Sequence, residues 1–316
     1  MKKRTKKAGK KCKALILAAV MLFAISGIPV QAETAGQAAS PANPVHHCTK
    51  QDGGADTTDW SYIYFGSYPQ TEVTGDELTS AITGAPYDSN GDAWVGGVKY
   101  RRLRKGDDNY KCFGSSRYRY FKWEKIKWKV LQNNGDTLFI AADKGLACKD
   151  YNEKYVPVTW ENCTLREWLN NDFYGEAFRS EEQDAIVRQT LANKSNPEFG
   201  VTGGNNTTDD IFLLSMEEVT NPEYGFCEDY STCSASRQMQ ASDYTGAMGT
   251  FITSTGDYTG NSWWWLRSPG HFKNFAAFAS YDGSIDRTGI YNYDNNMCVP
   301  ALHIDLFSAS WSLADD

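Results

Sequence analysis

The sequence predicts an α+β domain in which two helices pack on short antiparallel strands joined by long loops. Apolar and polar residues alternate at 124–143 and 299–306, which is typical of half-buried strands. Helical spacing of apolar residues is confined to two segments, 164–173 and 180–186. Residues 223–262 are rich in Gly, Ser and Thr, a composition typical of loops.

Residues 1–32 have the composition of a secretory signal peptide. The first thirteen residues, MKKRTKKAGKKCK, carry eight Lys/Arg and no acid, an apolar run follows at 14–28, and VQA at 30–32 fits a cleavage site. The apolar run is shorter than the roughly 20 residues that a spanning helix needs. We therefore expect a secreted, extracellular protein with no membrane insertion after cleavage.

Cleavage would leave an acidic protein. Residues 1–32 hold 8 of the 32 basic residues and none of the 39 acidic ones, so 24 basic residues face 39 acidic ones, a net charge of −15. Nucleic acid and anionic lipid are bound by clustered Lys and Arg, so we expect neither as a partner. The one basic stretch, YRRLRKG at 100–106, is interpreted as a solvated strand face, because its basic residues alternate with apolar ones.

Residues 33–58 are rich in Ala, Gly, Ser, Thr and Pro and poor in large apolar groups. Such a segment cannot bury enough surface to fold, so we expect a flexible tether, followed by a single domain at 59–316. The tripeptide HHC at 46–48 offers metal ligands, but it lies in the tether, and no C-x-x-C or H-x-x-x-H pattern supports a zinc site. We therefore expect no metal and no cofactor.

An odd number of cysteines remains after cleavage. They stand at positions 48, 112, 148, 163, 227, 233 and 298. An exported protein with seven cysteines keeps at least one free thiol or forms an intermolecular bond. Cys227 with Cys233 and Cys148 with Cys163 are the nearest pairs, and spacing alone establishes neither.

The segment 124–143 is predicted to form a hairpin. Ile126, Trp128 and Val130 alternate with lysines, which places one face of the strand in the core and the other in water. The turn NNGD at 133–136 then leads into TLFIAA as the second strand.

Two helices are predicted after this hairpin. Leu165, Trp168 and Leu169 lie at i, i+3 and i+4, the spacing of an amphipathic helix. The second helix begins at Ser180, where SEEQ has the spacing of a capping box and places acids in the first turn. A short buried strand follows at 211–214.

The C-terminal part alternates turns with short strands, at WWWLRS, FAAFAS, GIYNYD and VPALHIDL. In WWWLRS, the strand period puts Trp263 and Trp265 on one face and Trp264 and Leu266 on the other, and at least one face is expected to be core. Arg267 would be costly to bury alone, so we expect an internal salt bridge or bonds to loop carbonyls. Trp264 and Arg267 are therefore assigned structural roles.

Six motifs stand in a specific order along the chain. They are IYFGSYPQ (63–70), WKVL with its hairpin (128–143), TWENCTLREWLN (159–170), DDIFLLS (209–215), WWWLRSPG (263–270) and VPALHIDL (299–306). In this order they resemble an exported domain family of unknown function from Gram-positive anaerobes, marked by F-G-x-Y-P-Q, L-R-x-W-L-N and W-L-R-S-P-G. That family ends in V-R-P-A-L, whereas here Pro300 follows Val299 directly.

The C-terminal part also resembles the C-type-lectin-like fold of the formylglycine-generating-enzyme type. In that fold a W-x-x-R strand and a final R-P strand flank the variable loops of the ligand face. The resemblance implies that 59–316 is a C-type-lectin-like α+β domain, that WWWLRS is scaffold and that residues 271–298 carry recognition. Those enzymes use two reactive cysteines near the C-terminus; only Cys298 stands there in this chain, so their activity is not expected.

Catalytic motifs are absent from the sequence. It contains no G-x-S-x-G, no H-E-x-x-H, no phosphate loop and no D-x-D-x-D-G calcium loop. Acidic residues are numerous, so a hydrolase of polysaccharide or peptidoglycan that uses an Asp/Glu pair is the alternative function. Its carboxylates would lie at 223–262 or near Asp282 and Asp286.

Residues 271–296 interleave aromatic residues with Asn, Asp, Arg and Lys on short loops, a composition typical of recognition surfaces. We therefore expect a secreted, non-enzymatic protein that binds an extracellular glycan or protein through these loops. The candidate ligand-binding residues are His271, Phe272, Asn274, Tyr281, Asp286, Arg287, Tyr291, Asn292, Tyr293, Asp294 and Asn295.

Overall fold

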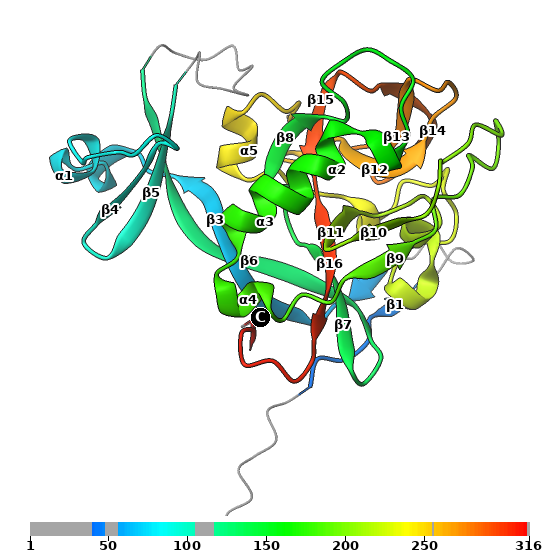
Figure 1. Cartoon of the computed structure of the whole chain (residues 1–316), viewed down its shortest axis with the longest axis horizontal. Coiled ribbons are helices and arrows are strands. Elements are labelled where there is room, and N and C mark those ends of the chain that lie inside the picture. Colours follow the sequence, from blue (N-terminus) through cyan, green and yellow to red (C-terminus); the bar gives the residue numbers. More distant parts are fainter. Residues whose placement is uncertain (1–39, 48–55, 105–116, 255, 315–316) are drawn as a thin grey trace, which may run out of the picture. The chain divides into compact units, whose positions relative to one another are not determined.

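A computed structural model describes residues 40–47, 56–104, 117–254 and 256–314. The predicted signal peptide lies outside the described residues. The chain from Pro41 to Asp316 forms one compact unit, drawn in Figure 1. Within the described residues, every helix falls short of the length and apolar character that a membrane span requires.

The larger of two main sheets is antiparallel and has eight strands. They are β3 (Tyr62–Glu72), β4 (Asp92–Val95), β5 (Val98–Leu103), β6 (Arg119–Asn133), β7 (Thr137–Ala142), β11 (Ile211–Leu213), β16 (Pro300–Asp305) and β17 (Ser312–Leu313). The strand order is β11-β16-β7-β6-β3-β17, and β5 pairs with the first residues of β6 and carries β4. The C-terminal strand β16 therefore lies inside this sheet, beside the β6–β7 hairpin (Figure 1).

The second main sheet carries the predicted recognition loops. Its strands are β8 (Ala147–Asp150), β12 (Trp264–Pro269), β13 (Phe275–Ala279), β14 (Ile285–Tyr291) and β15 (Asn295–Cys298). They are ordered β14-β13-β12-β15-β8, and only the β12–β15 pair is parallel. Two small antiparallel pairs complete the described strands, β1 (Val45–His47) with β2 (Thr57–Asp59) and β9 (Gln189–Leu191) with β10 (Thr207–Asp209).

Helices are short. The α-helices are α1 (Ser80–Thr83), α2 (Thr164–Trp168), α3 (Tyr174–Ala177), α4 (Ser180–Gln183) and α5 (Asp243–Ala247). A π-helical turn, η3 (Leu169–Phe173), joins α2 to α3 into one run that packs against β3 and β11. The 3-10 turns are η1 (Gly75–Glu77), η2 (Trp160–Asn162), η4 (Glu218–Thr220), η5 (Pro222–Tyr224), η6 (Ala235–Arg237) and η7 (Gly256–Tyr258).

The predicted fold class is wrong. The structure is mostly β-sheet, with 38% of residues in strands and 18% in helices, and one helix of seven or more residues. It is therefore not an α+β, C-type-lectin-like fold with two helices. The helix predicted from Ser180 is a single turn, because Ile186 forms a β-bridge with Ile304 and Val187 donates a backbone hydrogen bond to His303 (2.8 Å). Pairing with β16 thus overrides the local helical pattern.

The hairpin predicted at 124–143 is confirmed. Ile126, Trp128 and Val130 of β6 are buried while the lysines between them reach solvent. Strand β7 returns after a turn in which Gly135 adopts φ 95°. The indole of Trp128 donates to the carbonyl of Phe65 in β3 (2.7 Å), so this large side chain is buried with its polar atom satisfied.

Every residue of β12 is buried, so both faces of this strand are core, whereas Trp263, just before it, is partly buried. Trp264 donates its indole N–H to the carbonyl of Arg237 (3.1 Å), and Trp265 donates to that of Lys149 (2.9 Å). The two tryptophans therefore join β12 to neighbouring segments on opposite sides.

Part of the predicted tether, residues 41–47 and 56–58, is included in the compact unit. Strand β1 pairs with β2, and the Thr58 hydroxyl donates to the carbonyl of Gly225 (2.7 Å). Cys227 and Cys233 are free, as is Cys163, so neither pairing considered from the sequence is formed.

Candidate ligand-binding surface

Seven aromatic rings form a continuous line on the second sheet and the loops beside it. We call it the aromatic strip; in order it contains Phe199, His271, Phe272, Phe275, Tyr291, Tyr293 and Tyr155. The centroid distances between rings in contact are Phe199–His271 4.4 Å, His271–Phe272 4.1 Å, Phe272–Phe275 5.2 Å, Phe275–Tyr291 4.5 Å, Tyr291–Tyr293 5.8 Å, Tyr155–Tyr291 5.3 Å and Tyr155–Tyr293 5.1 Å. Most of these pairs are tilted or edge-to-face, the geometry that the ring quadrupole favours.

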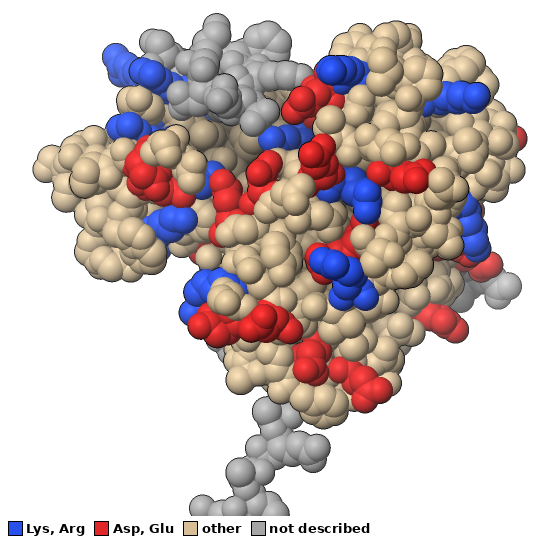
Figure 2. All heavy atoms as spheres, in the orientation of Figure 1, with Lys and Arg blue, Asp and Glu red and all other residues tan. Residues whose placement is uncertain are grey.

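Four rings of the strip face solvent. Phe272, Tyr291, Tyr293 and Tyr155 are 41% to 56% exposed. Exposed large aromatic side chains are normally scattered, so a contiguous group of them marks an interaction surface. Figure 2 shows that the upper right of the molecule, where Figure 1 places β13 and β14, is largely uncharged, with Lys, Arg, Asp and Glu side chains at its edges.

The strand register explains how β13 and β14 present the strip. Phe275 lies opposite Tyr291, next to a bulge between Ala276 and Phe278. Gly289 allows the bulge: its φ is 73°, and a Cβ there would lie 2.3 Å from the carbonyl oxygen of Ala276. The bulge therefore bends the sheet locally beside the pair Phe275–Tyr291.

A loop from far upstream completes the strip. Tyr155 lies in the 151–158 loop, which is held by hydrogen bonds from the backbone N–H of Asn152 to the carbonyl of Asn292 (2.7 Å) and from that of Val158 to the carbonyl of Lys273 (2.9 Å). The side-chain amide of Asn292 also donates to the carbonyl of Val156 (2.7 Å). Asn292 is buried, so it positions the loop and does not face a ligand.

The other polar candidates near the strip lie in or next to the turns that carry its rings. The carbonyl of Asn274 accepts from the backbone N–H of Asn292 (3.0 Å), and the N–H of Asp294 donates to the carbonyl of Tyr291 (3.1 Å). Asn295 begins β15 and pairs with Asp150 of β8. All three residues are partly exposed.

Three predicted residues lie outside the strip. The guanidinium of Arg287 lies 3.2 Å from the centroid of Tyr230, and it forms an ion pair with Glu198 (3.3 Å). Asp286 accepts from the backbone N–H of Gly289 (3.0 Å). Tyr281 belongs to a second aromatic group; its ring lies 6.3 Å from that of Phe251 and 5.7 Å from that of Tyr258.

These three residues line a shallow groove of about 660 Å³ on the same sheet. Trp263, Phe278 and Tyr230 line it as well. Glu198 at its border is adjacent in sequence to Phe199 of the strip. The structure thus divides the predicted site into the aromatic strip and this neighbouring groove.

The structural residues Trp264 and Arg267 lie below this surface. Arg267 is buried, forms a bidentate ion pair with Glu218, and donates to the carbonyl of Leu213 (2.9 Å). Its own carbonyl accepts from the hydroxyl of Tyr151 (2.9 Å), at the start of the loop that carries Tyr155. Arg267 therefore supports the strip through the backbone.

Sequence reasoning missed Tyr155 and Phe199. Both stand in polar, irregular segments without periodicity, EKYVPV and PEFGV, and an aromatic residue in such a segment is the one signal that the sequence offers. Their contacts depend on hydrogen bonds between loops distant along the chain, which no local pattern encodes.

Comparison with known proteins gives one match. A family model described as a domain of unknown function, DUF6273, matches residues 134–306. No curated protein and no solved structure matches the chain. The matched segment contains every ring of the aromatic strip, together with Arg267 and Glu218.

Proposed function

The chain belongs to the DUF6273 family of domains of unknown function, and we propose that it is an exported, non-enzymatic protein that binds an extracellular glycan on its aromatic strip. The observation that carries the proposal is the contiguity, through Phe275, of four exposed rings, Tyr155, Phe272, Tyr291 and Tyr293, at the end of β14 and on the loops beside it.

The chemistry of the strip suits a sugar chain. The C–H face of a pyranose is apolar and carries partial positive charge, so it packs against the negative face of an aromatic ring. The tyrosine hydroxyls and the partly exposed Asn274 and Asp294 offer hydrogen-bond partners for sugar hydroxyls at the margin. Tyrosine has few rotatable bonds, so ordering these side chains costs little entropy on binding.

Two further features agree with export to a glycan-rich surface. The N-terminal 32 residues have the composition of a signal peptide, and the remaining chain is acidic, which disfavours nucleic acid as a ligand. The strip itself is bordered by the exposed Lys154 and Lys273 and by the acidic Glu153 and Asp294, so charges of both signs lie at its margin.

The alternative, a hydrolase, gains no support from Asp282 and Asp286. Burial acts to raise the pKa of Asp282, but hydrogen bonds from the backbone and hydroxyl of Ser284 and from the Cys233 thiol hold that pKa below its usual value. A general acid needs a raised pKa. Asp286 is engaged by the N–H of Gly289.

The test is binding of residues 33–316 to an array of glycans, with mucin and matrix proteins before and after deglycosylation. A variant with Tyr155, Tyr291 and Tyr293 changed to Ala is compared with Trp94→Ala, which removes a still more exposed aromatic ring on β4, outside the strip. Glycan binding lost only in the triple variant supports the proposal. Binding to deglycosylated protein alone would make the ligand a protein, and glycan binding kept in a folded triple variant would move the site.

A further inference from the structure

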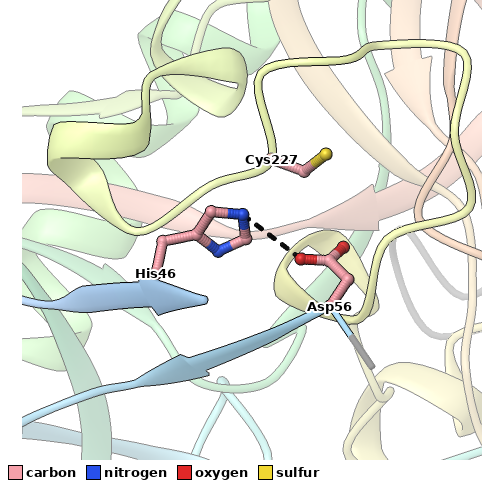
Figure 3. Close-up of side chains that lie close together, drawn as sticks. All are labelled: His46, Asp56 and Cys227. Atoms are coloured by element: carbon pink, nitrogen blue, oxygen red, sulfur yellow. Dashed lines mark ion pairs between the residues drawn. The ribbon is translucent and has the colours of Figure 1, made fainter. Parts of the chain in front are cut away.

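A second constellation lies where the β1–β2 pair meets the segment after η5. His46 of β1, Asp56 just before β2, and Cys227 each offer one ligand atom, and these atoms all lie within 4.8 Å of one another (Figure 3). The side chains of His46 and Asp56 are 6% and 18% exposed, and Cys227 is buried. His46 and Asp56 lie ten residues apart, and Cys227 lies far from both in the sequence.

The hydrogen bonds around His46 determine which ring nitrogen faces the other two residues. The Thr58 hydroxyl donates its proton to the carbonyl of Gly225 (2.7 Å), so toward the Nδ1 atom of His46 (2.9 Å) it offers a lone pair. Nδ1 must then carry the proton, and Nε2 of the neutral ring presents a lone pair. This arrangement, with the distal nitrogen held by an outer partner, is typical of metal-binding histidines.

The lone pair of Nε2 faces another acceptor. It lies 3.3 Å from Oδ1 of Asp56, and neither Nε2 nor either carboxylate oxygen has a hydrogen-bond partner among the described residues. The Nε2 lone pair and the Asp56 carboxylate thus converge in a buried place where a bound cation would satisfy both.

Cys227 stands next to a buried positive charge. Arg237 is fully buried and donates to the carbonyls of Cys227 (2.5 Å), Asp229 (2.8 Å) and Thr232 (2.9 Å). A cysteine that binds a metal does so as the thiolate, with release of its proton to solvent. Neutral His46 with two anionic ligands then balances the charge of a divalent ion.

We propose that His46, Asp56 and Cys227 bind a zinc ion, which crosslinks the β1–β2 pair to the 225–237 segment. One nitrogen, one oxygen and one sulfur ligand suit borderline Zn²⁺, whereas Ca²⁺ and Mg²⁺ take oxygen ligands and Cu⁺ prefers sulfur. The three described ligands leave the fourth tetrahedral position to a water molecule or another ligand. The sequence, by contrast, predicts no metal here.

Close packing around Gly225 shows where a metal crosslink between the two segments would stabilise the structure. A Cβ on Gly225 would lie 2.7 to 2.8 Å from Trp60, Pro44 and Thr58, so the strand pair sits directly on this glycine. The strand pair is otherwise short, three residues in each strand, and holds few backbone hydrogen bonds of its own. Metal binding that joins two segments adds directly to folding stability.

The experiment measures zinc in purified, untagged residues 33–316, followed by cobalt substitution. We expect one zinc per chain by mass spectrometry and, with Co²⁺, the thiolate-to-cobalt charge-transfer absorption. His46→Gln, Asp56→Asn and Cys227→Ser should each weaken zinc binding at least tenfold, and Cys227→Ser should abolish the charge-transfer band. His47→Gln, Asp59→Asn and Cys233→Ser are the matched controls, because His47 and Asp59 form an exposed pair next to the site and Cys233 is exposed.

A second measurement covers variants that fail to fold. Chelation of the wild-type protein should lower its melting temperature reversibly, with recovery on adding Zn²⁺ but not Mg²⁺. Retention of zinc and of the cobalt band by the three site variants would overturn the proposal. So would a wild-type protein that binds no zinc, or one in which peptide mapping finds Cys227 in a disulfide. The outcome is independent of glycan binding, which is measured at the aromatic strip.

Discussion

The ring of Tyr155 meets the ring of Tyr291 edge-on, with 5.3 Å between the centroids and 74° between the planes. Tyr155 precedes α2, whereas Tyr291 ends β14, and their contact depends on the buried amide of Asn292. Two exposed rings held this way form one surface, so a ligand that stacks on one of them also meets the other.

The first prediction follows from that shared surface. Tyr155→Ala should weaken ligand binding about as much as Tyr291→Ala, by about tenfold or about 1.4 kcal/mol, because each removes one face of the same contact. Titration of the ligand found on the array measures both affinities. Trp94→Ala should leave affinity unchanged, and full affinity in Tyr155→Ala would exclude the 151–158 loop from the site.

A positioning role for Asn292 gives a second prediction. Asn292→Ala removes the hydrogen bond to Val156 but no exposed surface, so it should weaken binding by releasing the loop. Hydrogen exchange should then rise at the amides of 152–158 while the β13–β14 amides stay protected. Weakened binding without any change in loop exchange would instead place Asn292 in contact with the ligand.

The ion pair beneath the site predicts a large loss of stability. The Arg267 side chain is 4% exposed, and Glu218 is its ionic partner. Glu218→Ala leaves that guanidinium buried without a counter-charge and should lower the free energy of unfolding by about 3 to 5 kcal/mol. Glu217→Ala is the control: it removes a 64% exposed partner of Lys194 and should cost less than about 1 kcal/mol in urea unfolding. Equal effects would mean that the Arg267 pair is not effectively buried.

Gly283 and Gly97 have similar positive φ angles but differ in the space around them. Alanine substitutions at the two positions therefore distinguish backbone strain from steric crowding. Gly283 has φ 84° and a Cβ there would lie 1.9 Å from the carbonyl oxygen of Ser234, whereas Gly97 has φ 81° and open space around it. Alanine at either position must adopt a left-handed backbone conformation, which costs about 1 to 2 kcal/mol. Gly283→Ala should cost at least about 2 kcal/mol more, because the backbone must also move. Similar unfolding free energies for the two variants would contradict the close packing of the Asp282–Gly283 turn.

The features predictable from the sequence are those that depend on local patterns. The alternation in β6 has a period of two, so Trp128 could be assigned to the core without its partners. The helix expected from Ser180 fails because Ile186 pairs with Ile304, and such pairing leaves no local trace. The aromatic strip is predictable only in part for the same reason. Tyr291 stands in an aromatic segment of the sequence, but Tyr155 reaches the strip through contacts between segments far apart along the chain.

The last prediction concerns His303. Its ring stacks on Phe139, the residue opposite it in β7, with 4.5 Å between the centroids and 1° between the planes. Burial lowers its pKa from 6.5 to about 4, while Glu218 acts weakly in the other direction. Between pH 6.5 and about pH 4 the unfolded chain therefore binds a proton that the folded protein does not. The stability that the neutral ring contributes is complete above pH 6.5 and is lost as the pH falls toward 4. The shift corresponds to at most about 3 kcal/mol at 1.36 kcal/mol per pKa unit.

Urea unfolding of wild-type protein and of His303→Gln, at pH 7 and at pH 4, measures this loss. Carboxylates titrate in both proteins, so the difference between them isolates His303. The wild type should lose more stability than the variant between the two pH values, and parallel losses would show that His303 is protonated as easily in the folded protein as in the unfolded chain.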